Sequence, residues 1–375
     1  MNNKKVLLVE PNFPIPKKSK NHKNFLPIGL LKLASYLREN DSDIKLVRGI
    51  IEDIFRLSEL ISFNPDEIWV TSLFTYWSQY VKETITYYKG FFPNSKVIVG
   101  GIYASLMPDH CKNYTGCDEV FIGIHNKAEK YYPAYDLVNV DYQIIHASRG
   151  CIRKCKFCGV IEIEPVFLSK KSIAKEIKSN KLIFYDNNLL ANECIENILE
   201  ELQNTKFREK VIHCECQSGF DGRLLTKNLA KKIKQARFIN PRIAWDNSYD
   251  EYPKIEKQLN YLITAGFNPK DIYVFMVYNY VLPFEIMEKK RLKCMEWGVQ
   301  IADCRYRPLN QTYDFYNPFA KTQTVNEYFV HEHWSDSEVR QFRKNVREQN
   351  ICIRHGFKEY NKELERKGKS KIGIM

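Results

Sequence analysis

The first 125 residues alternate between short apolar runs and segments whose apolar residues recur at helical spacing. Short runs rich in Val and Ile that end at Gly, Pro or Asn are typical of buried strands. The predicted strands are residues 4–12, 43–49, 66–74, 95–108 and 117–124, and the predicted helices are residues 27–40 and 78–92. Strands that alternate with helices in this way predict a parallel sheet built from β-α-β units.

The alternation restarts near residue 141. Strands are predicted at residues 141–148, 181–188, 210–217, 242–248, 271–279 and 299–306, and helices at residues 172–179, 193–204, 226–236, 252–266 and 282–298. These repeats predict a partial (β/α)6 barrel, whose functional side chains gather at the carboxyl ends of the strands. Beyond residue 307 only one helix is clear, at residues 335–350, with Ser335 as its cap and Glu338 in its first turn.

These patterns predict an α/β protein with three parts. Residues 1–135 are expected to form a Rossmann-like parallel sheet, residues 136–306 the barrel, and residues 307–375 an α-rich C-terminal extension. No low-complexity linker separates the first two parts, and their boundary rests on the polar, Tyr-rich stretch at residues 125–135. The pair Gly100-Gly101 closes a predicted strand, where it forms either a simple tight turn or a backbone turn toward a ligand.

The composition is that of a folded globular chain, with 375 residues, 44% hydrophobic and 27% charged. The net charge is +12, and about half of the excess lies between residues 338 and 371, where eleven Lys or Arg face five Asp or Glu. A polyanion or a phosphate-bearing substrate fits this charge, and so does a solvated basic tail. The four-residue apolar run at the start is too short for a signal peptide, so we expect a cytoplasmic protein without a membrane partner.

Three of the eleven cysteines, Cys151, Cys155 and Cys158, fall within eight positions directly after the predicted strand 141–148. In a reducing compartment such a cluster indicates a metal or catalytic site rather than a disulfide framework. Soft thiolates suit iron-sulfur clusters, and three ligands leave the fourth iron of a cubic cluster open. A zinc site is the alternative, with His146 as its fourth ligand, although the chain has no second CxxC pair. The flanking cations favour thiolates, and they are Arg149, Arg153, Lys154 and Lys156.

The pattern CxxxCxxC, with Phe157 before its last cysteine and after the first barrel strand, resembles the signature of the radical S-adenosylmethionine (SAM) superfamily. The resemblance covers residues 142–305. The segments "VLLVEPNFP", "PIGLLKLASYLRE" and "KVIVGGIYASLMP" resemble the cobalamin-binding-like domain that precedes this barrel in one branch of the superfamily. The Asp-x-His-x-x-Gly motif of modules that displace the lower base of cobalamin does not occur, so cobalamin binding stays open.

The resemblance implies that Cys151, Cys155 and Cys158 bind a [4Fe–4S] cluster and that SAM chelates its fourth iron. One-electron reduction then yields a 5′-deoxyadenosyl radical that abstracts hydrogen from a substrate, while the protein positions the reactants and excludes water. Such an enzyme needs an electron donor, for example flavodoxin or ferredoxin. Cobalamin is a candidate second cofactor.

The resemblance also places SAM contacts at the strand ends. Asp186, Asn187 and Asn188 stand where the family often has Gly-Gly-Glu, and they are predicted to accept hydrogen bonds from the methionine ammonium; otherwise they form a polar turn. Phe157 is expected to pack near the adenine. Met276, Val277 and Tyr278 either flank the adenine or belong to the core.

Strand alternation puts Glu215 and Gln217 on one face and Cys214 and Cys216 on the other. Both polar side chains need partners inside a barrel, so they are candidates for SAM or substrate contacts. Arg223 is a candidate for a bidentate pair with the SAM carboxylate. Trp245, Asp246 and Asn247 end the fourth strand and are candidates for the ribose hydroxyls.

The substrate is not named by the sequence. Side chains of the C-terminal part suited to phosphate or carboxylate binding or to proton transfer are Arg305, Arg307, His331, His333, Arg354 and His355. We expect a radical SAM enzyme acting on a small molecule or a nucleic acid, with a cobalamin-dependent methyltransferase or a tRNA-modifying enzyme as alternatives. A non-catalytic iron-sulfur or zinc protein that binds nucleic acid is the alternative of another class.

Overall fold

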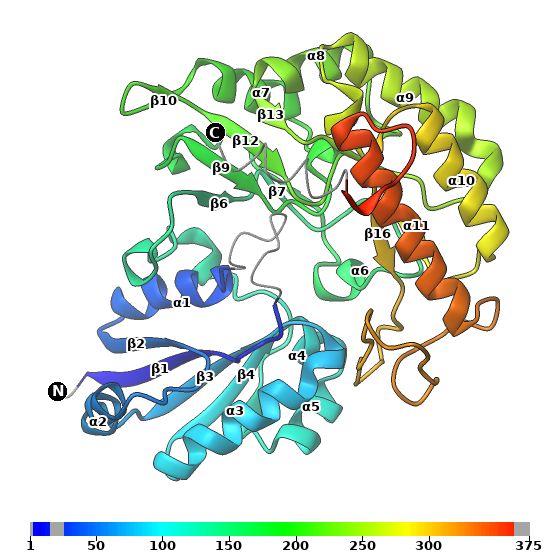
Figure 1. Ribbon diagram of the computed structural model, residues 1–375. Coiled ribbons are helices and arrows are strands. Elements are labelled where there is room, and N and C mark those ends of the chain that lie inside the picture. Colours follow the sequence, from blue (N-terminus) through cyan, green and yellow to red (C-terminus); the bar gives the residue numbers. More distant parts are fainter. Residues whose placement is uncertain (1–2, 16–25, 364–375) are drawn as a thin grey trace. The chain divides into compact units, whose positions relative to one another are not determined.

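The computed structural model describes residues 3–15 and 26–363, which form two compact units (Figure 1). Unit 1 contains residues 1–140, 153–165 and 308–315, and unit 2 contains residues 141–152, 166–307 and 316–375. The chain thus passes from unit 2 into unit 1 within the cysteine segment, between Cys151 and Cys155. Each unit is described by itself below.

Unit 1 is a five-stranded parallel sheet in the order β2-β1-β3-β4-β5. Its strands are β1 (Lys4–Glu10), β2 (Ser42–Arg48), β3 (Glu67–Ser72), β4 (Lys96–Gly101) and β5 (Glu119–Val120). Its helices are α1 (Ile28–Arg38), α2 (Ile54–Phe63), α3 (Ser78–Phe91), α4 (Ile102–Leu106), α5 (Pro108–Thr115) and α6 (Val160–Ile163). The strand order reverses between β1 and β3, and ligands of open parallel sheets bind beside such a reversal, at the carboxyl edge.

Side chains of β1 alternate between the two faces of this sheet. Val6 and Leu8 pack in one buried cluster with residues of α1, while Leu7 and Val9 pack in another with residues of α3 and α5. A strand covered on both faces needs a continuous apolar run, which explains the sequence "VLLV". The predicted Rossmann-like sheet is confirmed.

Unit 2 contains two parallel sheets. The first has the order β13-β12-β9-β6 and the second β14-β15-β16, with an isolated parallel bridge between Phe220 and Ile243. Its main strands are β6 (Gln143–Ile145), β9 (Lys181–Phe184), β12 (His213–Cys216), β13 (Phe238–Ile239), β14 (Arg242–Ala244), β15 (Tyr273–Tyr278) and β16 (Gln300–Arg305). Two antiparallel pairs accompany them, β7 (Ser148–Arg149) with β8 (Leu168–Ser169), and β10 (Lys206–Phe207) with β11 (Lys210–Val211). The partial barrel predicted from six repeats is confirmed.

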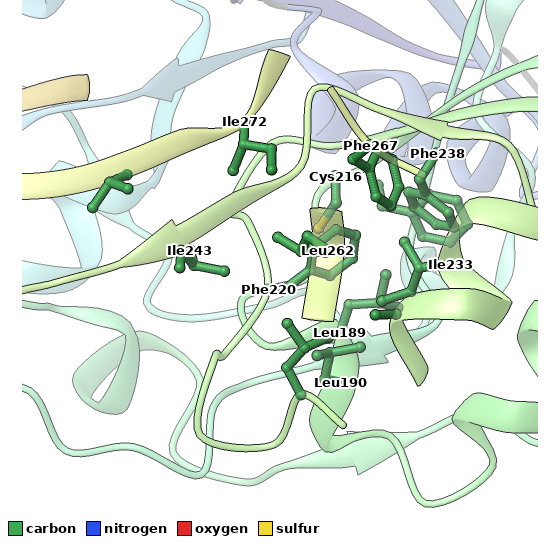
Figure 2. Packing of buried hydrophobic residues seen from close by; sticks show 14 of the residues in the cluster. Leu189, Leu190, Cys216, Phe220, Ile233, Phe238, Ile243, Leu262, Phe267 and Ile272 are labelled. Carbon is green, nitrogen blue, oxygen red and sulfur yellow. The ribbon is translucent and has the colours of Figure 1, made fainter. Parts of the chain in front are cut away.

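Helices cover the outer side of the strands of unit 2 (Figure 1). They are α7 (Ile195–Asn204), α8 (Lys227–Gln235), α9 (Tyr252–Thr264), α10 (Phe284–Glu296) and α11 (Asp336–His355). Figure 2 shows part of the core between strands and helices, where Cys216 lies close to Leu262 and Phe267. Ile243 belongs to the same buried cluster. The side chains that alternate with Cys216 and Ile243 therefore point to the inner side of the strands.

The C-terminal helix α11 closes the free edge of the second sheet. It begins with the predicted capping box of Ser335 and Glu338. The side-chain amide of Asn350 donates to the carbonyl of Ile301 at 2.7 Å and accepts from its N–H at 2.9 Å. Edge strands leave such backbone groups unpaired unless another element covers them, so α11 completes unit 2.

One predicted helix is wrong. Residues 172–179 contain only a short 3-10 turn, Ala174–Glu176. The carboxylate of Glu201 accepts from the N–H groups of Ile173 and Ala174, and Gln143 bonds to the backbone on the other side of the turn. These long-range bonds satisfy the backbone without a helix. No helix among residues 3–15 and 26–363 has the length and apolar character needed to cross a bilayer.

Candidate active site

Asp186 lies just past the carboxyl end of β9 and is fully buried. Its carboxylate accepts from the N–H of Ala147 at 3.0 Å and from the hydroxyl of Ser148 at 2.7 Å, and it also accepts from the N–H of Ser148. Burial raises the pKa of Asp186 to about 6, although these hydrogen bonds oppose the shift. Asp186 therefore holds the turn that leads into the cysteine segment. Its predicted role toward SAM stays a prediction.

Within the Asp-Asn-Asn stretch, Asn188 has a side-chain oxygen that could still accept a hydrogen bond from a ligand. Its side chain is 4% exposed, and its amide nitrogen lies 3.1 Å from the Asp221 carboxylate and 3.8 Å from the sulfur of Cys151. The carboxylate fixes the amide orientation, because a carboxylate only accepts. The oxygen of Asn188 is buried and receives no hydrogen bond from any described residue. Leaving such an acceptor unsatisfied costs about 1–3 kcal/mol, which a bound cationic donor would recover. Asn187 is half-buried between the two.

The three cysteines of the motif differ from most other cysteines of the chain. Cys151, Cys155 and Cys158 are half-buried, and none of the eleven cysteines forms a disulfide. The segment begins at Gly150, whose φ of 75° lies in the left-handed region, and the N–H of Cys158 donates to the carbonyl of Cys155 at 3.0 Å. By contrast, burial raises the pKa of Cys214, Cys216 and Cys294. The motif cysteines are accessible to a ligand, as are Cys194 and Cys304. Phe157 is half-buried.

Glu215 already has a partner within the protein. Its carboxylate pairs with Arg242 at 2.5 Å, and a second N–H of Arg242 donates to the carbonyl of Cys216 at 2.8 Å. The buried charge is thus compensated without SAM, contrary to the sequence argument that Glu215 needs a ligand. The alternation of Glu215 with the core residues Cys214 and Cys216 is as predicted. Gln217, the residue directly after β12, is half-buried.

The predicted SAM-carboxylate ligand Arg223 is exposed and pairs with Asp221 at 2.8 Å. Asp221 also accepts from Asn188, so it links Arg223 to the end of β9. Asn247 is exposed, and its amide donates to Glu251 at 3.0 Å. Arg223 and Asn247 thus have internal partners, and their roles toward SAM remain predictions.

A buried lysine fixes the end of β14. Lys290 of α10 is 0% exposed and donates to the carbonyls of Trp245 at 2.6 Å and Asn247 at 3.0 Å. Burial lowers the pKa of Lys290 to about 8, an effect that Asp246 opposes. Burial also raises the pKa of Asp246, against the attraction of Lys290 and Arg223. Lys290 and Asp246 together set the conformation of this strand end.

The apolar residues proposed to flank adenine divide between core and inner face. Trp245, Met276 and Tyr278 are buried in the core under the helices, which favours the core alternative over a ligand contact. Val277 alternates with them, is half-buried and pairs in register with Cys304. Cys304 is exposed.

The carboxyl edge of the unit 1 sheet has a tight turn. The hydroxyl of Ser72 donates to the carbonyl of Gly100 at 2.8 Å and accepts from the N–H of Ala104 at 3.1 Å. Gly101 has φ of 102°, and a Cβ there would lie 2.2 Å from the Ser72 carbonyl oxygen. The close approach of two strands therefore explains Gly101, and α4 begins directly after it.

An aromatic cluster lies at the same edge, after β1 and β3. Phe13 stacks on Trp77 with centroids 5.3 Å apart, and Phe74 stacks on Tyr76 at 5.0 Å. Phe74 remains 37% exposed. These stacked rings place apolar surface at the edge where parallel sheets bind ligands.

The C-terminal candidates are not brought together. Arg305 is buried, and its guanidinium lies over the rings of Tyr316 at 4.4 Å and Tyr328 at 5.0 Å, which is a structural role. Arg354 and His355 lie in the last turn of α11. His331 and His333 are neighbours, with ring centroids 5.0 Å apart. Arg307 is half-buried, and the end of the basic tail, beyond residue 363, lies outside the described residues.

Comparisons with known proteins bear on the N-terminal sheet and on the fold of most of the chain. Residues 22–130 match the model of the B12 binding domain family. The structure is similar to the cobalamin-dependent S-adenosylmethionine radical enzyme OxsB with aqua-cobalamin bound, at a TM-score of 0.55 and 15% identity, over 79% of this chain and 52% of that chain. The chain has the fold of a cobalamin-dependent radical SAM enzyme.

Two further states of OxsB match equally. The apo enzyme gives a TM-score of 0.52, and the enzyme with aqua-cobalamin and S-adenosylmethionine gives 0.53, both at 15% identity and over 79% of this chain. This chain spans only about half of the length of these structures, 51% and 52% respectively. No curated protein matches the sequence.

Sequence reasoning missed several residues that organise the site. Ser148, Asp221, Arg242 and Lys290 were not singled out, yet each binds a strand end or compensates a buried charge. Lys290 had a detectable signal, because it occupies a buried position of α10 between Met287 and Cys294 at helical spacing. The partners of Arg242 and Asp221 lie on other strands and leave no local pattern.

Proposed function

We propose that this protein is a radical SAM enzyme that also binds cobalamin. Cys151, Cys155 and Cys158 would hold a [4Fe–4S] cluster, with SAM on its open iron. When bound and reduced by a donor such as flavodoxin or ferredoxin, these cofactors supply a 5′-deoxyadenosyl radical for hydrogen abstraction from a substrate. The observation that carries the proposal is the unsatisfied oxygen of Asn188, whose amide nitrogen is 3.8 Å from the Cys151 sulfur.

The chain's own residues prepare this site. Asp186 fixes the backbone of Ala147 and Ser148, so the strand end that precedes Cys151 is held in one conformation. Asn188 would accept a hydrogen bond from an N–H of the SAM amino group. Asp221 orients the Asn188 amide and supplies a negative charge near the SAM cation. The arrangement binds and orients SAM before any chemistry takes place.

The cobalamin half of the proposal rests on the match of residues 22–130 and on the aromatic edge of unit 1. Phe74 and Trp77 offer apolar ring faces, whereas the Asp-x-His-x-x-Gly motif is absent from the sequence. The corrin would therefore be held by packing rather than by a histidine from that motif. A cobalamin-dependent methyl transfer is the specific reaction that this combination favours.

Anaerobic reconstitution tests the enzyme reading. The reconstituted protein should contain four irons per chain in the cluster and should release 5′-deoxyadenosine and methionine from SAM when dithionite or flavodoxin is added. Cys155→Ala should lose both the cluster and the cleavage, whereas Cys194→Ala, at an equally exposed cysteine outside the motif, should keep both. An intact cluster without SAM cleavage would refute the function, and a protein that binds zinc instead would favour the non-catalytic alternative.

The SAM contact is tested at Asn188. Asn188→Ala should weaken SAM binding roughly 10-fold or more, because a hydrogen bond to a charged group contributes about 1.5–3 kcal/mol. Asn187→Ala is the matched comparison one residue away. Equal losses in both variants would contradict the assignment, since only Asn188 has a buried, unsatisfied oxygen next to Cys151.

Cobalamin binding is tested by gel filtration with aquacobalamin and by the absorbance of the retained corrin. Phe74→Ala should lower retention, and Phe55→Ala, at an 82% exposed phenylalanine of α2, should not. Wild-type protein that retains no corrin would remove cobalamin from the proposal and leave the radical SAM reading standing. A substrate screen at two salt concentrations addresses the nucleic-acid alternative, because phosphate-backbone binding weakens steeply with salt.

A further inference from the structure

Three consecutive residues between β16 and α11 form a group with the chemistry of a metal site, and they are His331, Glu332 and His333. One potential ligand atom of each side chain lies within 4.8 Å of the others. His331 is half-buried, and the other two side chains are exposed to water. The group lies in unit 2 and shares no residue with the cysteine motif.

The backbone of this tripeptide is anchored at its first residue by Asn279. Asn279 is fully buried and has φ of 56° in the left-handed region, directly after the last residue of β15. Its oxygen accepts from the N–H of His331 at 2.9 Å, and its amide donates to the carbonyl of Phe329 at 2.9 Å. Asn tolerates this backbone conformation better than most residues, so the strand end is shaped to hold the segment.

A second anchor follows the tripeptide. The indole N–H of Trp334 lies 3.0 Å from the carbonyl of Tyr280 and 2.9 Å from that of Leu282. The ring of His331 also packs against Tyr280, with centroids 5.9 Å apart. Both ends of the tripeptide are therefore fixed to residues 279–282, and little backbone entropy remains to be lost when its side chains bind a common ion.

We propose that His331, Glu332 and His333 bind one divalent first-row metal ion of the zinc class. Imidazole nitrogens and a carboxylate oxygen are the ligands that such ions prefer, and zinc sites of two histidines and one glutamate keep a further coordination position for water or a ligand oxygen. The N–H of His333 donates to Nδ1 of His331 at 3.2 Å, a long hydrogen bond. An ion on Nδ1 replaces this bond. An ion on Nε2 leaves the proton on Nδ1, which then donates and can no longer accept from His333.

This site is separate from the proposed cluster and predicts a metal content that iron-sulfur chemistry does not explain. In a preparation reconstituted with iron, the tripeptide would hold an additional ion beyond the four of the cluster. The open coordination position faces water, because Glu332 and His333 are exposed. An anionic oxygen of a small molecule is the group that such a position would take.

Cobalt is the probe for the test, because Co²⁺ replaces zinc and absorbs visible light. Untagged, reconstituted full-length protein is desalted and titrated anaerobically with CoCl₂ and then with ZnCl₂. Wild type should bind one Co²⁺ per chain beyond the cluster iron, with visible d–d bands that Zn²⁺ abolishes. His331→Ala and His333→Ala should each weaken Co²⁺ binding about 10- to 100-fold or more, since loss of even an outer partner has an effect of that size.

The control variants distinguish the loss of a metal ligand from misfolding of the protein. His213→Gln changes an exposed histidine of β12 and should leave Co²⁺ binding unchanged. Glu332→Gln removes one charge from an exposed side chain, so weaker binding in this variant cannot arise from misfolding. The proposal is refuted if wild type binds no stoichiometric Co²⁺, or if all three tripeptide variants bind it as wild type does. Neither result would affect the tests of SAM cleavage above.

Discussion

The buried ion pair between Glu215 and Arg242 allows a direct test of whether the polar interior of unit 2 is structural or awaits a ligand. The side chains of Arg242 and Glu215 are only 4% and 9% exposed, and their charged atoms are 2.5 Å apart. Glu215→Ala leaves the guanidinium buried without its counter-charge, although the carbonyl of Cys216 still accepts one N–H. Breaking a buried pair in this way lowers the free energy of unfolding by about 3–5 kcal/mol.

Removing both charges should be far less damaging. The double variant Glu215→Leu/Arg242→Met replaces the pair with apolar side chains of similar length, and such replacements are often neutral or stabilising by about 1–4 kcal/mol. The double variant should therefore recover most of the stability lost in Glu215→Ala. Strong non-additivity of this kind is expected only for residues in direct contact.

Urea unfolding followed by tryptophan fluorescence provides the measurement, since Trp245 lies in the core of unit 2. Lys232→Ala is the control, because it breaks surface ion pairs with Glu196 and Glu200 and should hardly move the midpoint. A loss below about 1 kcal/mol for Glu215→Ala would refute the reasoning, as would a double variant no more stable than the single one. SAM binding by a stable double variant would show that Glu215 is not needed as a SAM contact, and loss of SAM binding would support the sequence-based prediction.

Three further predictions follow from local geometry. The pKa of Asp186, raised to about 6, means that the folded protein holds this proton more tightly than the unfolded chain, so the free energy of unfolding should rise as pH falls from about 6 to 4. Asp186→Asn should remove about 3 kcal/mol of this dependence in the difference between the two unfolding curves. Gly101→Ala should destabilise unit 1 by more than about 1 kcal/mol, whereas Gly90→Ala, in α3 with no atom near the added Cβ, should stabilise it slightly in thermal unfolding. Ser335→Ala should cost about 1 kcal/mol in urea unfolding through loss of the capping box, and an unchanged midpoint would contradict that role.

Local sequence patterns were sufficient for most of the fold. Most strands of both units begin within a few residues of their predicted starts, because runs such as "VLLV" and "VFMV" are covered by helices on one or both sides. The strand predicted at residues 95–108 was too long, since β4 ends at Gly101 and the chain continues as α4. The helix α2 was not predicted, since only Leu60 of its residues is buried and its apolar pattern does not mark a core face. The short turn at Ala174–Glu176 was predicted as a helix because its competing partners, Glu201 and Gln143, are distant in sequence.

The sequence predicted which polar residues follow the strand ends, but not which of them can bind a ligand. The positions of Asp186, Asn188, Asp246 and Asn247 after their strands follow from the alternation of elements. Which of these side chains has capacity left for a ligand depends on partners such as Ser148 and Lys290 that come from other strands and helices. Long-range pairing leaves no periodic signal in the sequence.

Asp186 and Asn188 are close in the sequence, but of the two only Asn188 has a buried side-chain oxygen that receives no hydrogen bond from a described residue. In the sequence the carboxylate is the better acceptor for an ammonium group, because it carries a charge and more lone pairs than an amide. In the fold the Asp186 carboxylate already accepts hydrogen bonds from Ala147 and Ser148, at the start of β7. Burial also disfavours the charged form of Asp186. The weaker acceptor, Asn188, keeps an unsatisfied oxygen because its own nitrogen is held by Asp221. Asp221 thus places a negative charge near Cys151 through Asn188. Under the proposed function, this charge would attract the SAM cation without placing the Asp221 carboxylate in direct contact with the thiolates.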